Sequence, residues 1–131
     1  METVLAWSIY RQGFAGGGNG FAYDPADIAR VMVLHRDLMA HWRRIYPGRV
    51  FDLNYGDLVE DTGRTTRALA EAVGLTWSEA WLTPERGTSQ VLTASAEQAH
   101  RPIYHGSDTG WHRYDAQIGP LKAALTSAGV L

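Results

Sequence analysis

The chain has 131 residues, of which 45% are hydrophobic, so it is long enough for one domain with its own core and too short for two domains of ordinary size. Its formal net charge of -2 excludes a general affinity for nucleic acid or for an anionic membrane, because both attractions need a positive field. The absence of cysteine excludes a disulfide framework and a thiolate metal site, and it suits a reducing compartment.

No stretch reaches the roughly 18 apolar residues that a membrane span needs, and polar residues interrupt the N-terminal segment where a secretory signal would be apolar. We therefore expect a cytoplasmic protein with neither a membrane nor a nucleic-acid partner. The five histidines show no spacing typical of metal ligands, so no metal site is expected.

The first predicted element is an aromatic helix within METVLAWSIYRQGF, residues 1–14. A helix start usually carries a Ser, Thr, Asp or Asn cap for its first amides, and only Glu2 and Thr3 are available here. The glycine-rich residues 15–20 that follow lack the Gly-Lys-Ser/Thr ending of a phosphate-binding loop. They are interpreted as a plain connection.

The clearest helical pattern covers residues 24–48. Asp24 suits the N-cap, Pro25 suits the first helical position, and Asp27 lies near the positive end of the helix dipole. Residues at three- and four-residue steps predict one core-facing side. They are Ile28, Val31, Met32, His35, Leu38, Met39, Trp42 and Ile45. The pair at 47–48, Pro-Gly, is expected to end the helix.

The next segment, RVFDLNY at residues 49–55, is β-prone and predicts one strand. A lone strand leaves its backbone donors and acceptors unpaired, so this one needs a partner or becomes distorted. Residues 56–61 suggest a turn or short helix. Residues 62–75 predict a helix ending at Gly74, which suits a left-handed C-cap, and residues 76–82 suggest a further helical turn.

From residue 83 to about residue 114 helical periodicity disappears, and so long an irregular segment is typical of a binding loop or a lid. A short helix beginning near Pro120 closes the chain. Alone, the chain is thus expected to be mostly α-helical with one or two short strands.

Six blocks in order resemble the C-terminal half of the bacterial sulfotransferases that are often fused to tetratricopeptide repeats. They read SIYRQ.F, FAYD, LM.HW...PG, Y.DLV.D, GL.W, and TAS..Q..RPIY......W.RY...GPL. The resemblance implies an α/β class with a P-loop-like fold, of which residues 1–131 form a single partial domain lacking the loop for the 5′-phosphosulfate. The chain would then begin inside a motif, just after the arginine that these enzymes use for phosphate. Within the motif, YGDLV has Gly56 where the family more usually has glutamate.

The resemblance also implies a cofactor, 3′-phosphoadenosine 5′-phosphosulfate (PAPS) or its product adenosine 3′,5′-bisphosphate (PAP). It places Ser8 at a serine that binds the 3′-phosphate. Taken without the resemblance, a helical serine hydroxyl more often bonds back to the preceding turn. Both interpretations of Ser8 stay open at this stage.

A second cofactor block lies in RPIYHGSDTGWHRY, residues 101–114. The resemblance assigns cofactor contacts to six residues there. They are Arg101, Tyr104, His105, Gly106, Ser107 and Trp111. Arginine forks and glycine amides suit phosphate, and an aromatic face suits adenine. The alternatives are a surface ion pair for Arg101 and a core plug for Trp111. His105 and His112 stand where relatives often have arginine, which attracts phosphate more strongly than a neutral imidazole.

The resemblance therefore implies the C-terminal portion of an enzyme that transfers a sulfuryl group from PAPS to a hydroxyl or amine acceptor. This portion would supply the side of the cofactor site that binds the 3′-phosphate and the adenine. No catalytic residue is assigned to it, and the isolated chain is expected to be inactive. The acceptor cannot be read from these residues. The alternative is a non-catalytic module that binds a partner or a second copy of itself, covering the apolar surface where a missing N-terminal half would pack.

Overall fold

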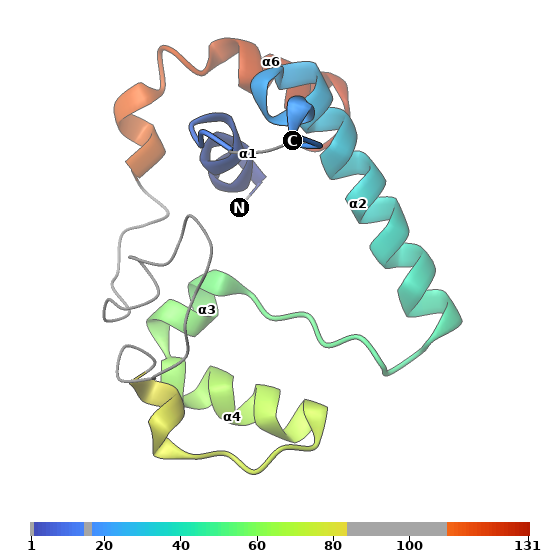
Figure 1. Ribbon diagram of the computed structural model, residues 1–131, viewed down its shortest axis with the longest axis vertical. Coiled ribbons are helices and arrows are strands. Elements are labelled where there is room, and N and C mark those ends of the chain that lie inside the picture. The colour runs from blue at the N-terminus through green and yellow to red at the C-terminus, as the bar shows by residue number, and fades with distance from the viewer. Residues whose placement is uncertain (1, 15–16, 84–109) are drawn as a thin grey trace. The chain divides into compact units, whose positions relative to one another are not determined.

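The computed structural model describes residues 2–14, 17–83 and 110–131, and these residues are mostly helical (Figure 1). They form two compact units that are considered separately. The terminal unit combines Met1–Val50 with Asp108–Leu131, and the middle unit comprises Phe51–Ser107. The chain thus leaves the terminal unit once, builds the middle unit, and returns. Within the described ranges there is no β-strand.

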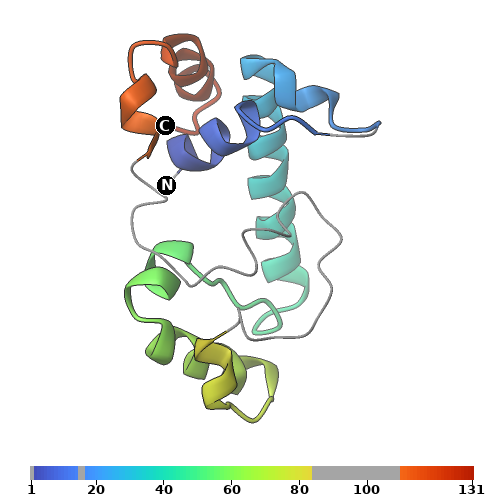
Figure 2. The same ribbon diagram turned by 60° about the vertical axis from the view of Figure 1, so that its left-hand side comes forward.

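The terminal unit is a set of helices around a small apolar core. Its elements are α1 (Glu2–Tyr10), the 3₁₀ turn η1 (Gly20–Tyr23), α2 (Pro25–Ile45), the 3₁₀ turn η4 (Gly110–Tyr114) and α6 (Gly119–Ser127). Helix α2 packs against α6, η1 and α1, as the views in Figures 1 and 2 show. The buried residues that join these helices are Ala6, Ile28, Ala29, Ile118, Leu121 and Leu125.

Helix α2 begins where the sequence predicts. The Asp24 side chain accepts hydrogen bonds from the backbone amides of Ala26, at 2.8 Å, and Asp27, at 3.0 Å, and Pro25 occupies the first turn. A capping carboxylate satisfies amides that have no partner inside the helix, and its charge complements the helix dipole. The predicted end is confirmed too, since α2 stops at Ile45, just before the Pro-Gly pair.

The predicted core-facing side of α2 is buried only in its first half. Ile28 is fully buried, whereas Leu38 is 50% exposed. Trp42 and Ile45, farther along the helix, are also exposed. The helix is 21 residues long, so α1, η1 and α6 cover its first turns and its later turns extend beyond them. The second half of α2 therefore presents an apolar surface.

The middle unit contains α3 (Tyr55–Glu60), α4 (Thr62–Val73) and the 3₁₀ turn η2 (Glu79–Leu82). The predicted strand at residues 49–55 is wrong, because Phe51–Asn54 has no regular secondary structure and Tyr55 already belongs to α3. Strand formation depends on pairing with another strand, and the described residues provide none. The segment instead leads to Asn54, which caps α3.

Gly56, at a position where the enzymes that the sequence resembles more usually have glutamate, lies beside this cap. The Gly56 amide donates to the Asn54 side-chain oxygen at 2.7 Å. A Cβ atom at position 56 would lie 3.1 Å from the same oxygen, closer than most Cβ contacts. Glycine therefore lets Asn54 approach the first turn of α3, and a larger residue would require the capping side chain to shift.

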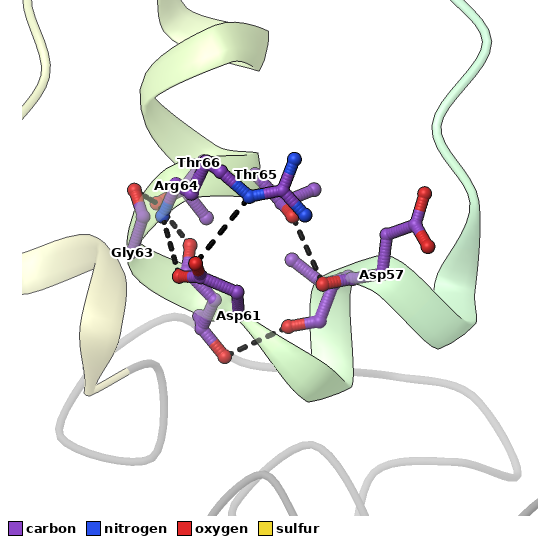
Figure 3. A network of polar contacts seen from close by, with 8 residues as sticks. Asp57, Asp61, Gly63, Arg64, Thr65 and Thr66 are labelled. Atoms are coloured by element: carbon purple, nitrogen blue, oxygen red, sulfur yellow. Dashed lines mark hydrogen bonds and ion pairs between the residues drawn. The ribbon is translucent and has the colours of Figure 1, made fainter.

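A polar network fixes the turn between α3 and α4 (Figure 3). The Asp61 carboxylate accepts a hydrogen bond from the Arg64 backbone amide, at 2.9 Å, and lies 3.4 Å from the Nε atom of the same arginine. The Thr65 hydroxyl donates to the Asp57 carbonyl at 2.9 Å, which ties the second helix to the first. Helix α4 ends at Gly74, whose φ of 71° is the left-handed C-cap predicted from the sequence.

Candidate functional site

Ser8 is exposed on α1. The neighbouring residues Ala6 and Trp7 face the core of the terminal unit, so helical geometry turns the next position toward solvent. Among the described residues the Ser8 hydroxyl makes no hydrogen bond, neither to the preceding turn nor to another side chain. This exposed hydroxyl is therefore able to donate a hydrogen bond to a ligand.

The start of α1 lacks a conventional cap, and Glu2 partly compensates. A hydrogen bond from its own backbone amide is the main cause that lowers the pKa of Glu2 below its ordinary value. A carboxylate in the first turn also complements the positive end of the helix dipole. Glu2 therefore adds negative charge to the end of the helix that carries Ser8.

Trp111 is half-buried on η4 and packs against the core of the terminal unit. The His112 ring stacks on its indole, with ring centroids 3.8 Å apart and planes inclined by 30°. The Lys122 ammonium lies 5.0 Å from the centroid of the same indole, within the range of a cation–π interaction. The carboxylate of Asp115 holds this ammonium by an ion pair. Trp111 is thus in contact with the core, an imidazole and a paired cation.

Helix α1 and η4 meet although about a hundred residues separate them in sequence. The rings of Trp7 and Tyr114 lie 4.8 Å apart between centroids, inclined by 33°. Both elements also pack on the same core cluster. The structure therefore brings the element that carries Ser8 next to the element that carries Trp111.

The other five predicted cofactor-binding residues lie outside the described residues. They are Arg101, Tyr104, His105, Gly106 and Ser107. The structure accordingly describes two of the seven predicted site residues, Ser8 and Trp111, and their assignment to a cofactor stays a prediction.

A groove of about 460 Å³ lies elsewhere in the terminal unit, between α1, η1, α2 and the C-terminal segment. Its lining is mainly apolar, with three ionisable side chains, and includes neither Ser8 nor Trp111. The lining residues are Glu2, Leu5, Ile9, Phe21, Val31, Met32, His35, Arg36 and Val130. Such a surface suits apolar side chains better than a phosphate.

Two further observations concern other kinds of site. The described residues contain no group of three or more His, Asp or Glu side chains that could hold a metal ion. No helix in the described ranges is both long enough and apolar enough to cross a bilayer.

Sequence reasoning missed the residues that surround Trp111. The ion pair of Asp115 with Lys122, and the position of Lys122 over the indole, depend on how η4 folds against α6. The seven-residue spacing of the pair carries no signal, because a turn and the first part of α6 intervene. His112 is adjacent to Trp111 in sequence, but only the structure shows that their rings stack.

Comparison with known proteins identifies the family. A model of the sulfotransferase family matches residues 4–79, more than half of the chain. The match includes Ser8 and ends before the block that contains Trp111. No solved structure matches the chain significantly.

A curated relative extends the similarity beyond that region. An uncharacterised protein of Aquifex aeolicus (strain VF5) is 34% identical over 126 residues, which cover 95% of this chain and 17% of the relative. The chain thus spans about a sixth of the length of that protein. Together, the family match over more than half of the residues and the ordered blocks show that this chain belongs to the sulfotransferase family.

Proposed function

We propose that the chain is the C-terminal portion of a PAPS-dependent sulfotransferase and supplies the 3′-phosphate and adenine side of the cofactor site. The observation that carries the proposal is the contact between α1 and η4 through Trp7 and Tyr114. This contact brings the exposed hydroxyl of Ser8 and the aromatic group of Trp111 into one folded unit. A phosphate-binding hydroxyl and an aromatic platform are what a 3′-phosphorylated adenosine requires.

The side chains of the terminal unit fit such a nucleotide. The Ser8 hydroxyl has no competing hydrogen bond within the described residues and can donate one to a phosphate oxygen. Arg113 is exposed on η4 and adds further N–H donors for a phosphate. In the whole enzyme PAPS would supply the sulfuryl group, and these residues would bind and orient the nucleotide that carries it.

The proposed reaction is in-line transfer. The acceptor oxygen or nitrogen forms a bond to sulfur, the bond between sulfur and the bridging phosphate oxygen breaks, and the acceptor proton passes to a base. Positive charge near the bridging oxygen stabilises the charge that develops there. None of the residues proposed to bind the nucleotide is proposed to stabilise this charge or to accept the proton. The chemical step is therefore assigned to other residues of a complete enzyme.

The apolar surface of α2 supports the idea of a partial domain with a P-loop-like α/β fold. Leu34 and Leu38 are at least half exposed, and Trp42 and Ile45 continue the same side of the helix. Contiguous apolar surface of this kind usually marks an interaction surface. In a P-loop-like fold, helices cover a parallel sheet, so a sheet supplied by additional chain would bury this side of α2.

Calorimetric titration with PAP tests the proposal. The purified chain should bind PAP saturably, and both Ser8→Ala and Trp111→Ala should weaken the binding. Adenosine 5′-monophosphate lacks the 3′-phosphate, so Ser8→Ala should leave its weaker binding unchanged. Ser127→Ala, at an exposed helical serine of α6, and Trp42→Ala are matched controls and should bind PAP as the unmodified chain does.

Two results would contradict the proposal. One is a folded chain, judged by its helical circular dichroism, that binds no PAP at millimolar concentration. The other is PAP binding that neither Ser8→Ala nor Trp111→Ala weakens, because the nucleotide would then bind somewhere else.

The second candidate function is a non-catalytic module that associates with itself or with a partner. The exposed side of α2 favours it, since association would bury Leu34, Leu38 and Trp42. Light scattering distinguishes self-association from association with a different partner. A dimer mass that Leu38→Lys converts to a monomer mass would support self-association. A monomer mass for the unmodified chain would exclude self-association and leave the cofactor proposal unaffected.

A further inference from the structure

Trp111 does not have a free ring face toward His112. The centroids of the two rings are 3.8 Å apart, and the angle between the ring planes is 30°. At this separation the rings are in van der Waals contact. A base stacking on this side of the indole would have to displace the imidazole. The side chain available to a ligand here is therefore His112, which is exposed, whereas Trp111 is half-buried.

The support beneath His112 is held at several points. Trp111 packs against the core of the terminal unit, and the Lys122 ammonium lies over its ring. Asp115 is ion-paired with that ammonium, so the cation is itself held in position. A cation over an indole is attracted by the ring quadrupole, which disfavours rotation of the indole away from it. Together these contacts restrain the surface on which the imidazole rests.

From this arrangement we infer that His112, seated on Trp111, is the side chain that stacks on the adenine base, and that Trp111 and Lys122 are positioning residues. The inference rests on the proposed function, because it assumes that a nucleotide binds at this unit. It changes the role of Trp111 from the stacking platform to the support of that platform. An imidazole ring is a suitable stacking partner for a base, as histidines that bind unpaired bases show.

The arrangement has a consequence for specificity. A ring that contacts the base, and not the phosphates, affects only ligands that have a base. Removing it should therefore weaken PAP but not ribose 3,5-bisphosphate, which has both phosphates and no base. Ser8 should show the opposite pattern, because a hydroxyl on the 3′-phosphate affects both ligands.

Titration of the full chain with these two ligands tests the inference. Loss of a stacking partner usually weakens binding enough that His112→Ala should raise the Kd of PAP about tenfold. The Kd of ribose 3,5-bisphosphate should not change. His112→Phe keeps an aromatic ring and should retain PAP affinity within about threefold of the unmodified chain. His41→Ala, at an exposed histidine of α2, is the matched control and should change neither value.

Lys122 is tested through its effect on the same base-dependent difference. Lys122→Met removes the cation over the indole and should weaken PAP severalfold while leaving ribose 3,5-bisphosphate unchanged. Lys122→Arg keeps a cation at this position and should restore PAP affinity. A purely structural role would weaken both ligands together.

The outcomes separate the inference from the proposed function. PAP binding that depends on Ser8 but is unchanged in His112→Ala would overturn the inference and leave the proposed function in place. Equal losses for PAP and ribose 3,5-bisphosphate in His112→Ala would assign the imidazole to a phosphate and also overturn it. Absence of PAP binding by the folded unmodified chain would overturn both.

Discussion

The indole nitrogen of Trp77 donates a hydrogen bond of 2.9 Å to the Thr66 hydroxyl, across the space between α4 and the segment that follows it. Thr66 is 6% exposed, and its hydroxyl in turn donates to the Thr62 carbonyl at 2.7 Å. The Arg67 guanidinium lies 4.0 Å from the centroid of the Trp77 ring. A single tryptophan is thus held at its nitrogen and over its ring by consecutive residues of one helix.

Thr66→Val should destabilise the middle unit by about 1–2 kcal/mol. Valine has nearly the same shape but accepts no hydrogen bond, so the Trp77 N–H would be left unsatisfied in a partly buried place. Urea unfolding followed by circular dichroism measures the change. Thr66→Ser keeps the hydroxyl and should retain most of the stability. Equal losses for the two variants would assign the effect to packing of the methyl group.

Gly74→Ala should destabilise the chain by about 1 kcal/mol, because alanine is strained at a φ of 71°. A Cβ atom there would meet nothing within 4 Å, so the cost comes from the backbone alone. Gly119→Ala is the control, since it also meets nothing within 4 Å and has no positive φ. Thermal unfolding should separate the two variants, and equal melting temperatures would contradict the prediction.

The pKa of Asp61 lies below its ordinary value, and the main cause is the hydrogen bond from the Arg64 backbone amide. A lowered pKa means that the folded state favours the carboxylate. The resulting stability is present above the unfolded-state pKa of about 3.9 and is lost as pH falls through the lower folded-state value. An NMR titration of the Asp61 carboxyl carbon measures that value directly.

The same titration identifies the cause. Arg64→Ala removes the guanidinium and keeps the backbone amide, so the pKa of Asp61 should stay below its ordinary value. Arg64→Pro removes the amide hydrogen and should bring the pKa of Asp61 back toward that value. Proline is tolerated in the first turn of a helix, which makes the second variant feasible. A pKa that returns to its ordinary value in Arg64→Ala would show that the ion pair dominates.

The purified chain should transfer no sulfuryl group from PAPS to a phenol or an amine. The residues proposed for the cofactor act on its 3′-phosphate and adenine, whereas catalysis requires charge stabilisation at the sulfate end. Chromatographic detection of the sulfated product measures this, with a complete sulfotransferase as the positive control. Reproducible PAPS-dependent product formation by the chain alone would contradict the prediction.

The elements that the sequence predicted best are those with local causes. Asp24 and Pro25 define a helix start by side-chain chemistry within four residues, and Gly74 defines an end by its own backbone freedom. The strand at residues 49–55 failed because strand formation depends on a partner elsewhere in the chain. Asn54 instead uses its side chain to begin α3, a local signal that competes with β propensity.

For the candidate site, the sequence predicted which residues belong to it but not how they are arranged in space. Ser8 and Trp111 could be named from ordered motifs, which fix positions in a sequence without fixing neighbours in space. The surroundings of Trp111 depend on how η4 packs against α6 and α1, and a single sequence has no signal for that packing. For the same reason the sequence left open whether Trp111 contacts a ligand or the core. The structure shows that Trp111 packs against the core.

The divided terminal unit affects how the protein is made. Ile28 and Ala29 are synthesised about ninety residues before their partners Ile118, Leu121 and Leu125. The Arg36 guanidinium likewise donates a hydrogen bond of 2.8 Å to the Gly129 carbonyl, which is synthesised much later. Helices α3 and α4 have their contacts close in sequence, so a nascent chain can complete them first. During translation the apolar residues of α2 therefore stay exposed until α6 is made, and exposed apolar surface in this interval favours aggregation.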